Sequence, residues 1–311
     1  MIGQKVKRRV PAGGERKVIE HLPSIPSLEF KECIGQGHFS HVYQAIYKGK
    51  YPAAVKVIER GSEKLIQNEV ELLNELKGSE NIVQLYKVIH DEESGLTMLV
   101  FEFLKSAKMD SIFRQLDIRK VRFLLKSILS GLKDSHEKGI IHRDIKIGNI
   151  NIAPRFKYVK ILDWGCGTHI TSDMSPKAGS RQCRSPEMLL GYRNYGTKGD
   201  IWAVGIFILY LLSCGEIPWK ARTTANALEI MSKYFGGNAL RNIAANLDLE
   251  INEELAAKWT PEPVKSIESS FSSEMNNLFN EDLIDLMHKL LELNIEKRIS
   301  ASEALKHPFF D

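Results

Sequence analysis

A chain of 311 residues, 43% hydrophobic and 26% charged, can bury a large core and is long enough for about two domains or one bilobal unit. Its net charge of +4 is too small an excess to indicate nucleic-acid or membrane binding by itself. Four widely separated cysteines without a CxxC pair indicate neither a disulfide framework nor a zinc site. The composition therefore predicts a soluble globular protein of a reducing compartment, with neither nucleic acid nor a membrane as a direct partner.

The chain begins with a segment, residues 1–27, that contains KVKRR, a Gly-Gly pair and three prolines and has no regular apolar period. We predict a flexible basic tail here, without the apolar core of a signal peptide. The KVKRR run favours residence in the nucleus, and the cytoplasm is the alternative. The longest apolar run of the chain, residues 201–212, is 12 residues long, and a membrane span needs about 20. We expect a buried helix there.

Residues 28–103 are rich in strand patterns. Apolar and polar residues alternate in SHVYQAIY and YPAAVKVI, and the turn residues Lys48-Gly49-Lys50 between them predict a hairpin. The segment 62–78 predicts a helix that ends at Gly78, because several residues fall on one helical side: Leu65, Glu69, Leu72, Leu73 and Leu76. Two further strand-like runs, IVQLYKVI and LTMLVFEF, complete a small β-rich lobe.

From residue 104 to residue 311 the patterns are mostly helical. They include DIRKVRFLLKSILSGLKDSHEK, LIDLMHKLLEL and ASEALKHPFF, whereas residues 246–280 are polar and irregular. The change of pattern predicts an α+β fold with two lobes, a small β-rich lobe at 28–103 and a larger, mainly helical lobe at 104–311.

A glycine-rich turn and a lysine indicate an anion site in the small lobe. IGQGHFSHVY at 34–43 places glycines between two strands, where a chain turns tightly and presents backbone N–H groups to an anion. Lys56 ends the apolar alternation of AAVK, and a lysine in a half-buried strand needs an anionic partner. Glu69 can supply it. Either the two residues form a surface ion pair, or Glu69 holds Lys56 so that the lysine binds phosphate oxygens.

Charged residues also interrupt the apolar run IIHRDIKIGNINI at 140–152, where charge is costly unless it is paired or used. Asp163, in ILDWG, follows Asp144 by 19 positions. In order, the chain contains GxGxFS, AVK, a helical Glu, HRDxKxxN, D-W-G, S-P-E and DxWxxG. This series resembles the signature of the protein kinases, and its order and spacing extend over residues 28–311.

The resemblance implies a role for each matching residue of the larger lobe. Asp144 accepts the proton of the substrate hydroxyl, and Lys146 steadies the transferred phosphoryl group. Asn149 and Asp163 hold magnesium ions that bridge the phosphates of ATP. Lys146 within HRDIKIGN is the serine/threonine form of this loop, so the resemblance implies a serine/threonine kinase with ATP and Mg as cofactors.

The resemblance also implies which residues bind the nucleotide. Phe101 is expected to close the rear of the adenine slot, and the backbone of Glu102 and Leu104 is expected to read the edge of the base. The full nucleotide-binding set belongs to the small lobe and the start of the next segment: Ile34, Gly35, Gly37, Ser40, Val42, Ala54, Lys56, Glu69, Phe101, Glu102 and Leu104, with Asn149 and Asp163 contributing through the metal.

Other matches imply supporting roles. Arg143 is expected to pair with a phosphate or acid on the activation segment, with a structural role in holding the loop as the alternative. Glu187, in S-P-E, is expected to pair with Arg298. The DxWxxG motif is expected to support the catalytic loop from below through Asp200, Trp202 and Gly205.

Two residues depart from the common kinase pattern. Ser40 stands where many kinases have the third glycine, and Trp164 replaces the phenylalanine of D-F-G. Serine still allows a close backbone approach, and casein kinase II shares both features, so we expect an active enzyme. We interpret Cys166 as a packing residue rather than a reactive thiol, because no lysine or histidine neighbours it in sequence.

Several segments are similar to the cell division control protein 7 family of replication kinases. The stretch from FEFLKSAKMD to GIIHRD matches its hinge and long helix, and GIFILYLLSCGEIPW matches its helical lobe. Casein kinase II is the alternative, favoured by D-W-G, LVFEF and GSRQCRSPEMLLGYRNY. Members of the first family carry long insertions that clasp an activating subunit, whereas this chain has almost none. An activating regulatory subunit is therefore implied only by the resemblance.

Protein substrates follow from the same resemblance. By the kinase template, GSRQCRSPE lies against the residues after the acceptor; it carries Arg181 and Arg184, and no acidic residue occurs from Ser175 to Pro186. We therefore expect a serine or threonine in an acidic or phosphorylated context.

A pseudokinase scaffold is the alternative of another class. A scaffold has no need of a complete catalytic set, and this chain carries all of it: Lys56, Glu69, Asp144, Asn149 and Asp163.

Overall fold

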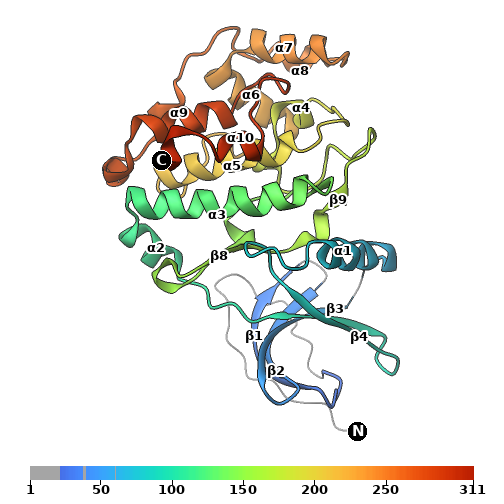
Figure 1. The fold of residues 1–311 in the computed structure, drawn as a ribbon. Helices are drawn as coiled ribbons and strands as arrows, with labels where there is room; N and C mark the ends of the chain where they lie inside the picture. The colour runs from blue at the N-terminus through green and yellow to red at the C-terminus, as the bar shows by residue number, and fades with distance from the viewer. Residues whose placement is uncertain (1–21, 38–39, 60) are drawn as a thin grey trace. The chain divides into compact units, whose positions relative to one another are not determined.

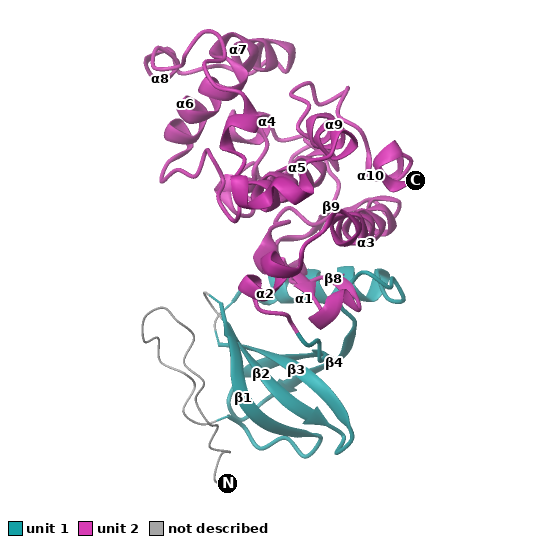
Figure 2. Ribbon diagram, turned by 90° about the vertical axis from the view of Figure 1, so that its left-hand side faces the viewer, with its two compact units in different colours: residues 1–105 teal, residues 106–311 magenta. Residues whose placement is uncertain are grey.

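The computed structural model describes residues 22–37, 40–59 and 61–311. The chain divides into two compact units, Met1–Lys105 and Ser106–Asp311 (Figure 2), and this division lies two residues beyond the predicted lobe boundary. The KVKRR run, His38, Phe39 and Arg60 lie outside the described residues. The fold is of the α+β class that the sequence predicts, with a β-rich unit 1 and a mainly helical unit 2 (Figure 1).

The described part of unit 1 consists of an antiparallel sheet of five strands and a helix, with the strand order β1-β2-β3-β5-β4 (Figure 1). The elements are β1 (Leu28–Gln36), β2 (Ser40–Tyr47), β3 (Tyr51–Ile58), α1 (Glu63–Glu75), β4 (Leu85–Asp91) and β5 (Leu96–Glu102). The predicted hairpin is confirmed, because β2 and β3 cover SHVYQAIY and YPAAVKVI. Its turn contains two left-handed residues, Lys48 at φ 51° and Gly49 at φ 67°.

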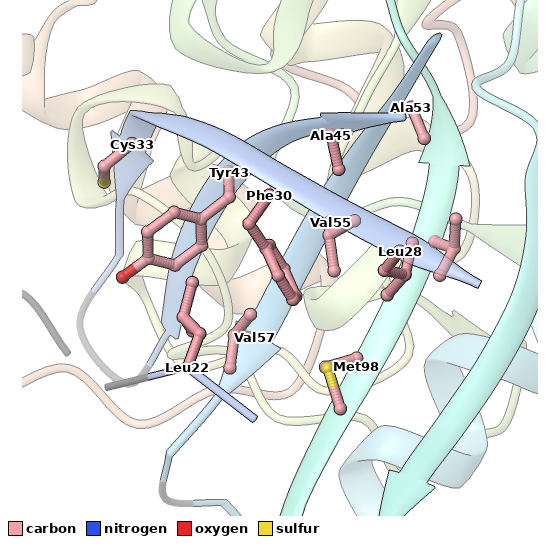
Figure 3. Close-up of a cluster of buried hydrophobic side chains, with 11 residues drawn as sticks. Leu22, Leu28, Phe30, Cys33, Tyr43, Ala45, Ala53, Val55, Val57 and Met98 are labelled. Atoms are coloured by element: carbon pink, nitrogen blue, oxygen red, sulfur yellow. The ribbon is translucent and has the colours of Figure 1, made fainter. Parts of the chain in front are cut away.

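The alternation of β2 and β3 puts one face of the sheet into an apolar cluster (Figure 3). The buried members are Leu22, Leu28, Phe30, Cys33, Tyr43, Ala45, Ala53, Val55, Val57, Met98 and Val100. Leu22 is only 1% exposed, and Ile25 packs against the same cluster. The packed part of unit 1 therefore begins before Leu28, where the predicted tail was expected to end. The sequence-based boundary was wrong here because two isolated apolar residues have no period to detect.

Helix α1 places its predicted apolar side against unit 1 over most of its length. Glu69, Leu72 and Leu73 are buried, and Leu76 follows as the C-cap. Leu65 is an exception, since 60% of its surface is exposed. It shares the helical side of the others but lies in the first turn of α1, where the rest of the described chain does not cover it.

Unit 2 is built mainly from helices. Its strands are β6 (Ile140–Ile141), β7 (Ile150–Ile152), β8 (Val159–Ile161) and β9 (Thr168–His169), which pair as β6-β9 and β7-β8. Its α-helices are α2 (Met109–Gln115), α3 (Ile118–His136), α4 (Pro186–Leu189), α5 (Lys198–Leu212), α6 (Thr224–Phe235), α7 (Gly237–Asn246), α8 (Glu253–Ala256), α9 (Glu281–Leu290) and α10 (Ala301–Ala304). The region 246–280, which has no regular sequence pattern, contains α8 and two short 3-10 helices, Ile267–Ser270 and Ser273–Leu278.

Helix α5 forms the centre of unit 2. Nearly all of its residues are buried, as expected for the apolar run at 201–212. Gly205 is needed for this packing, because a Cβ atom there would lie 2.6 Å from Cδ2 of Leu291. Among the described residues, no helix is both long and apolar enough to cross a membrane.

Candidate active site

The predicted site residues divide between the two units, with the nucleotide-binding set in unit 1 and the catalytic set in unit 2. In unit 1, strand register brings several of them to one face of the sheet. Val42 of β2 is paired with Lys56 of β3, and Ala54 of β3 is paired with Phe101 of β5. Since side chains alternate along a strand, these four residues share the face opposite the apolar cluster. The residues predicted to contact the adenine ring and the lysine predicted to bind phosphate therefore lie on one surface of the sheet.

Lys56 and Glu69 form the ion pair that the sequence predicts. Nζ of Lys56 lies 2.8 Å from Oε1 and 2.9 Å from Oε2 of Glu69. The side chains are 18% and 5% exposed, so this is a largely buried pair and not the surface pair of the alternative interpretation. The carboxylate contacts the ammonium with both oxygens and thereby fixes its position on the sheet face.

The glycine-rich turn lies at the end of β1 and the start of β2. The backbone N–H of Gly37 donates to the carbonyl of Ser40 at 2.7 Å, which closes the turn. Ile34, one residue before Gly35, is 43% exposed on a strand whose neighbouring Cys33 is buried. An exposed apolar side chain beside a glycine turn suits contact with a flat apolar ligand such as a base.

The segment predicted to read the adenine edge follows Phe101. The N–H of Glu102 donates to the carbonyl of Gln84 at 3.0 Å, and its Oε1 accepts from the N–H of Gln84 at 2.9 Å. A base could therefore be read at Glu102 only through its carbonyl oxygen. Leu104 is half-buried just beyond β5.

Asp144 lies at the centre of the catalytic set in unit 2 and is only 7% exposed. Its Oδ2 accepts from Nζ of Lys146 at 2.6 Å and from Nδ2 of Asn149 at 3.1 Å. Its Oδ1 accepts from the backbone N–H of Ser180 at 2.8 Å. These donors hold the carboxylate in one orientation, as positioning of a proton acceptor requires.

Asn149 and Asp163 come close because β7 pairs with β8. Ile150 is paired with Ile161, and the N–H of Leu162 donates to the carbonyl of Asn149 at 2.8 Å. Nδ2 of Asn149 donates to Asp144, so its Oδ1 is the atom of this amide that can ligate a cation. Asp163 is exposed and has a left-handed backbone, at φ 52°. Strained backbone of this kind concentrates at functional sites.

Asp200 supports the catalytic loop, as the resemblance implies. This fully buried carboxylate accepts from the backbone N–H groups of His142 at 2.8 Å and Arg143 at 2.7 Å, and from Nε2 of His136 at 3.0 Å. Burial opposes its charge, but the hydrogen bond from His136 and the charges of His136 and His142 outweigh burial and lower the pKa of Asp200. Its bonds hold Arg143 in a left-handed conformation, at φ 66°.

Two functional residues were missed by sequence reasoning, namely Gly179 and Ser180. Besides donating to Asp144, Ser180 accepts from Nζ of Lys146 at its Oγ, at 2.9 Å. Gly179, at φ +68°, lets the segment approach, because a Cβ atom there would lie 2.0 Å from the carbonyl oxygen of Arg143. The only sequence signal was a Gly-Ser pair 35 and 36 positions after Asp144, with no periodicity to mark it.

We expect replacement of Gly179 by alanine to lower kcat at least about tenfold. The added Cβ forces Arg143 and Ser180 apart and removes the N–H donor from Asp144. The matched control is Gly139→Ala, since Gly139 also has φ +68° but has no atom within 4 Å of the position that an added Cβ would take. Steady-state kinetics of both variants test this, and equal losses in the two would mean that backbone strain alone is responsible.

Arg143 does not have its expected partner. Its Nε donates to the carbonyl of Cys166 at 2.5 Å, and its Nη2 lies 3.5 Å from the carbonyl of Gly167. The residues from Ser175 to Pro186 contain no acid that could pair with it. The structure supports the alternative, in which Arg143 holds the loop after D-W-G through backbone carbonyls.

Glu187 and Arg298 form the predicted pair. Nη1 and Nη2 of Arg298 lie 2.7 and 2.9 Å from Oε1 and Oε2 of Glu187, and both side chains are fully buried. Arg298 also donates to the carbonyls of Glu292 and Lys198. A buried pair with this geometry is costly to break, because the remaining charge would be unpaired.

The two cysteines near the catalytic loop are not activated. Burial raises the pKa of the Cys166 thiol, and the Asp144 and Asp163 carboxylates raise it further. Burial raises the pKa of Cys183 to about 12. Both thiols therefore stay protonated at neutral pH, which agrees with the interpretation of Cys166 as a packing residue.

The catalytic loop of unit 2 and the Lys56–Glu69 pair of unit 1 each have the contacts expected from the kinase signature. The comparison with protein families gives the same result, since the protein kinase domain family matches residues 28–310. The chain belongs to the protein kinase family. It is thus a phosphotransferase of a family that uses ATP, usually with Mg²⁺.

The residues of this kinase fit those cofactors. Mg²⁺ prefers oxygen ligands and is usually bound by one or two carboxylates together with substrate phosphates and water. Oδ1 of Asn149 and the carboxylate of Asp163 are such oxygens, and the buried amine of Lys56 suits phosphate oxygens. Within unit 2, Asn149 and Asp163 would therefore hold Mg²⁺, and within unit 1, Lys56 would bind phosphate oxygens.

Proposed function

We propose that this kinase phosphorylates serine and threonine residues of proteins. The observation that carries this proposal is the bridge made by Lys146, whose ammonium contacts both Oδ2 of Asp144 and Oγ of Ser180. The bridge places a cation beside the proton acceptor, where a short aliphatic hydroxyl would be bound. A cation at this point stabilises the charge that develops on the transferred phosphoryl group.

In the proposed mechanism Asp144 orients the acceptor hydroxyl and takes its proton. The donors on Asp144 fix its orientation, so the hydroxyl is held in line with the phosphoryl group. Lys56, Asn149 and Asp163 position the phosphates and their metal, and Mg²⁺ supplies neutralisation of the phosphate charge when bound. Ser180 contacts both Lys146 and Asp144 and so fixes their positions relative to each other.

We further propose that substrates are acidic after the acceptor. Arg181 donates to the carbonyl of Arg222 at 2.6 Å and lies 3.4 Å from that of Ala221. Arg184 donates to the carbonyls of Ala178 and Gly179 at 2.9 and 2.7 Å. Carbonyls carry partial charges only, and within the described residues neither arginine pairs with a carboxylate. Burial and the nearby charge of Arg181 lower the pKa of Arg184, and the charge of Asp144 opposes this shift.

A positional-scanning peptide array tests this preference. We expect aspartate, glutamate or a phosphorylated residue after the acceptor to raise kcat/KM several-fold over lysine or proline, because a cation near 4 Å from a carboxylate is worth up to about 4 kcal/mol at a protein surface before desolvation. The double variant Arg181→Ala/Arg184→Ala should lose the preference, and Arg114→Ala/Arg119→Ala, which changes two exposed arginines elsewhere, should keep it. A preference that survives the first double variant would show that other residues read the acidic context.

As the physiological role we propose a replication kinase of the cell division control protein 7 type in the nucleus, with casein kinase II-like activity as the alternative. The support is the sequence similarity of the hinge, the long helix and the helical lobe, together with KVKRR. Depletion of the kinase in its own cells should arrest them with unreplicated DNA, whereas continued replication would favour the alternative.

A reporter fused to residues 1–27 should enter the nucleus, and an even distribution would count against that localisation.

A further inference from the structure

A groove in unit 2, away from the residues assigned to catalysis, has an apolar floor and a basic rim. It lies between α2 and the turn that joins β7 to β8, which are side by side in Figure 1, and its volume is about 400 Å³. Its lining residues are Ser106, Ala107, Lys108, Ser111, Ile112, Gln115, Pro154, Arg155 and Phe156. None of them is acidic.

The walls of the groove are fixed by contacts within unit 2. The N–H of Ala107 donates to the carbonyl of Ile152 at 2.8 Å, and Nδ2 of Asn151 donates to Oγ of Ser106 at 2.5 Å. Nζ of Lys120 lies 5.6 Å from the centre of the Phe156 ring. These contacts tie the segment before α2 to β7 and hold the Phe156 ring beside Lys120.

The turn that forms one wall has a costly backbone. Arg155 and Phe156 are consecutive non-glycine residues with left-handed conformations, at φ 58° and φ 57°. Each such residue costs about 1–3 kcal/mol, and such strain is retained where the surroundings impose it, often at ligand clamps. This backbone places Phe156 in the groove wall and leaves Arg155 exposed at the rim.

The charges of the rim identify the occupant. Lys108 and Arg155 are both exposed, and neither makes an ion pair within the part of the chain that the structure describes. Ile112, in the floor, is 2% exposed, and Phe156 and Pro154 add apolar surface. We propose that the groove docks an acidic segment of a protein partner, with one or two apolar side chains on the floor and carboxylates at Lys108 and Arg155. The inference does not depend on the proposed substrate preference at Arg181 and Arg184.

A fluorescein-labelled decapeptide with Leu-Phe at its centre and four glutamates on each side tests the proposal. It has no hydroxyl and cannot be a substrate. We expect saturable binding by fluorescence anisotropy to the full chain at low salt, and at least about tenfold weaker binding to Lys108→Glu/Arg155→Glu. Replacing Leu-Phe by Ala-Ala, or the glutamates by lysines, should weaken binding by a similar factor.

Two matched variants locate the binding. Lys126→Glu/Lys297→Glu alters net charge equally at exposed positions outside the groove and should bind the decapeptide as the wild type does. Arg181→Ala/Arg184→Ala should also bind it, so that a failure of the proposed acidic substrate preference is distinguishable from a failure of docking. Both double variants that introduce glutamate, Lys108→Glu/Arg155→Glu and Lys126→Glu/Lys297→Glu, should phosphorylate a short peptide substrate at the wild-type rate. This activity would show that they are folded.

Absence of saturable binding would overturn the proposal, as would equal binding to Lys108→Glu/Arg155→Glu. Loss of binding in Arg181→Ala/Arg184→Ala alone would assign the decapeptide to the substrate segment instead. A single-stranded RNA oligonucleotide that binds the groove when the decapeptide does not would show that the basic rim serves a nucleic acid.

Discussion

Replacement of Asp144 by asparagine is expected to lower kcat at least about a hundredfold while the Kd for Mg-ATP changes by no more than about twofold. Asparagine has the same shape, and its single amide oxygen can still accept the hydrogen bond from the backbone N–H of Ser180, whereas its NH2 group cannot accept from Lys146. Its amide cannot take the proton of the acceptor hydroxyl, and general-base and positioning roles typically contribute about a hundredfold or more. Nucleotide binding should persist because no nucleotide-binding role is assigned to Asp144.

Steady-state kinetics and calorimetric titration with Mg-ATP measure the two quantities. Asp282→Asn is the matched control, since Asp282 is an exposed residue in the first turn of α9. A variant at Asp144 that retains more than about a tenth of wild-type turnover would contradict the assignment of this residue.

Replacement of Lys56 by methionine should lower kcat by about a hundredfold or more without unfolding the protein. Methionine keeps much of the length of the side chain but loses the ammonium that Glu69 positions for phosphate oxygens. Glu69 is left without this partner and is 4% exposed. Its carboxylate can turn toward water, so we expect Tm to fall by only a few degrees.

Calorimetric melting and kinetics of the same preparation separate the two effects, with Lys87→Met as a control at an exposed lysine of β4. A Tm far below that of the wild type would show that the Lys56–Glu69 pair is mainly structural, and the catalytic interpretation of Lys56 would then be wrong.

The sequence predicted those parts of the fold that have a local signal. Strands β2 and β3 were located from alternation and a glycine turn, and α1 from the recurrence of Glu69, Leu72 and Leu76. Burial of Leu22 and exposure of Leu65 have no such signal, because each depends on which distant residues cover the side chain.

The site shows the same limit. Asp144, Asn149 and Asp163 are marked by a motif, and the pairing of Glu187 with Arg298, 111 positions apart, was implied only by the family resemblance. The contact of Gly179 with Arg143 arises from the path of the activation segment in three dimensions. The carbonyl partners of Arg143 could not be predicted, because any residue has a carbonyl and none is distinguished by its side chain.

The central claim is that this protein kinase transfers phosphate to serine and threonine through Asp144. The most direct test incubates the purified chain with Mg²⁺, γ-labelled ATP and a peptide library with equal amounts of serine, threonine and tyrosine acceptors, followed by phosphoamino-acid analysis. We predict label in phosphoserine and phosphothreonine at least about tenfold above phosphotyrosine, and none above background with Asp144→Asn. Label confined to phosphotyrosine, label that persists in Asp144→Asn, or no transfer at all would contradict the claim.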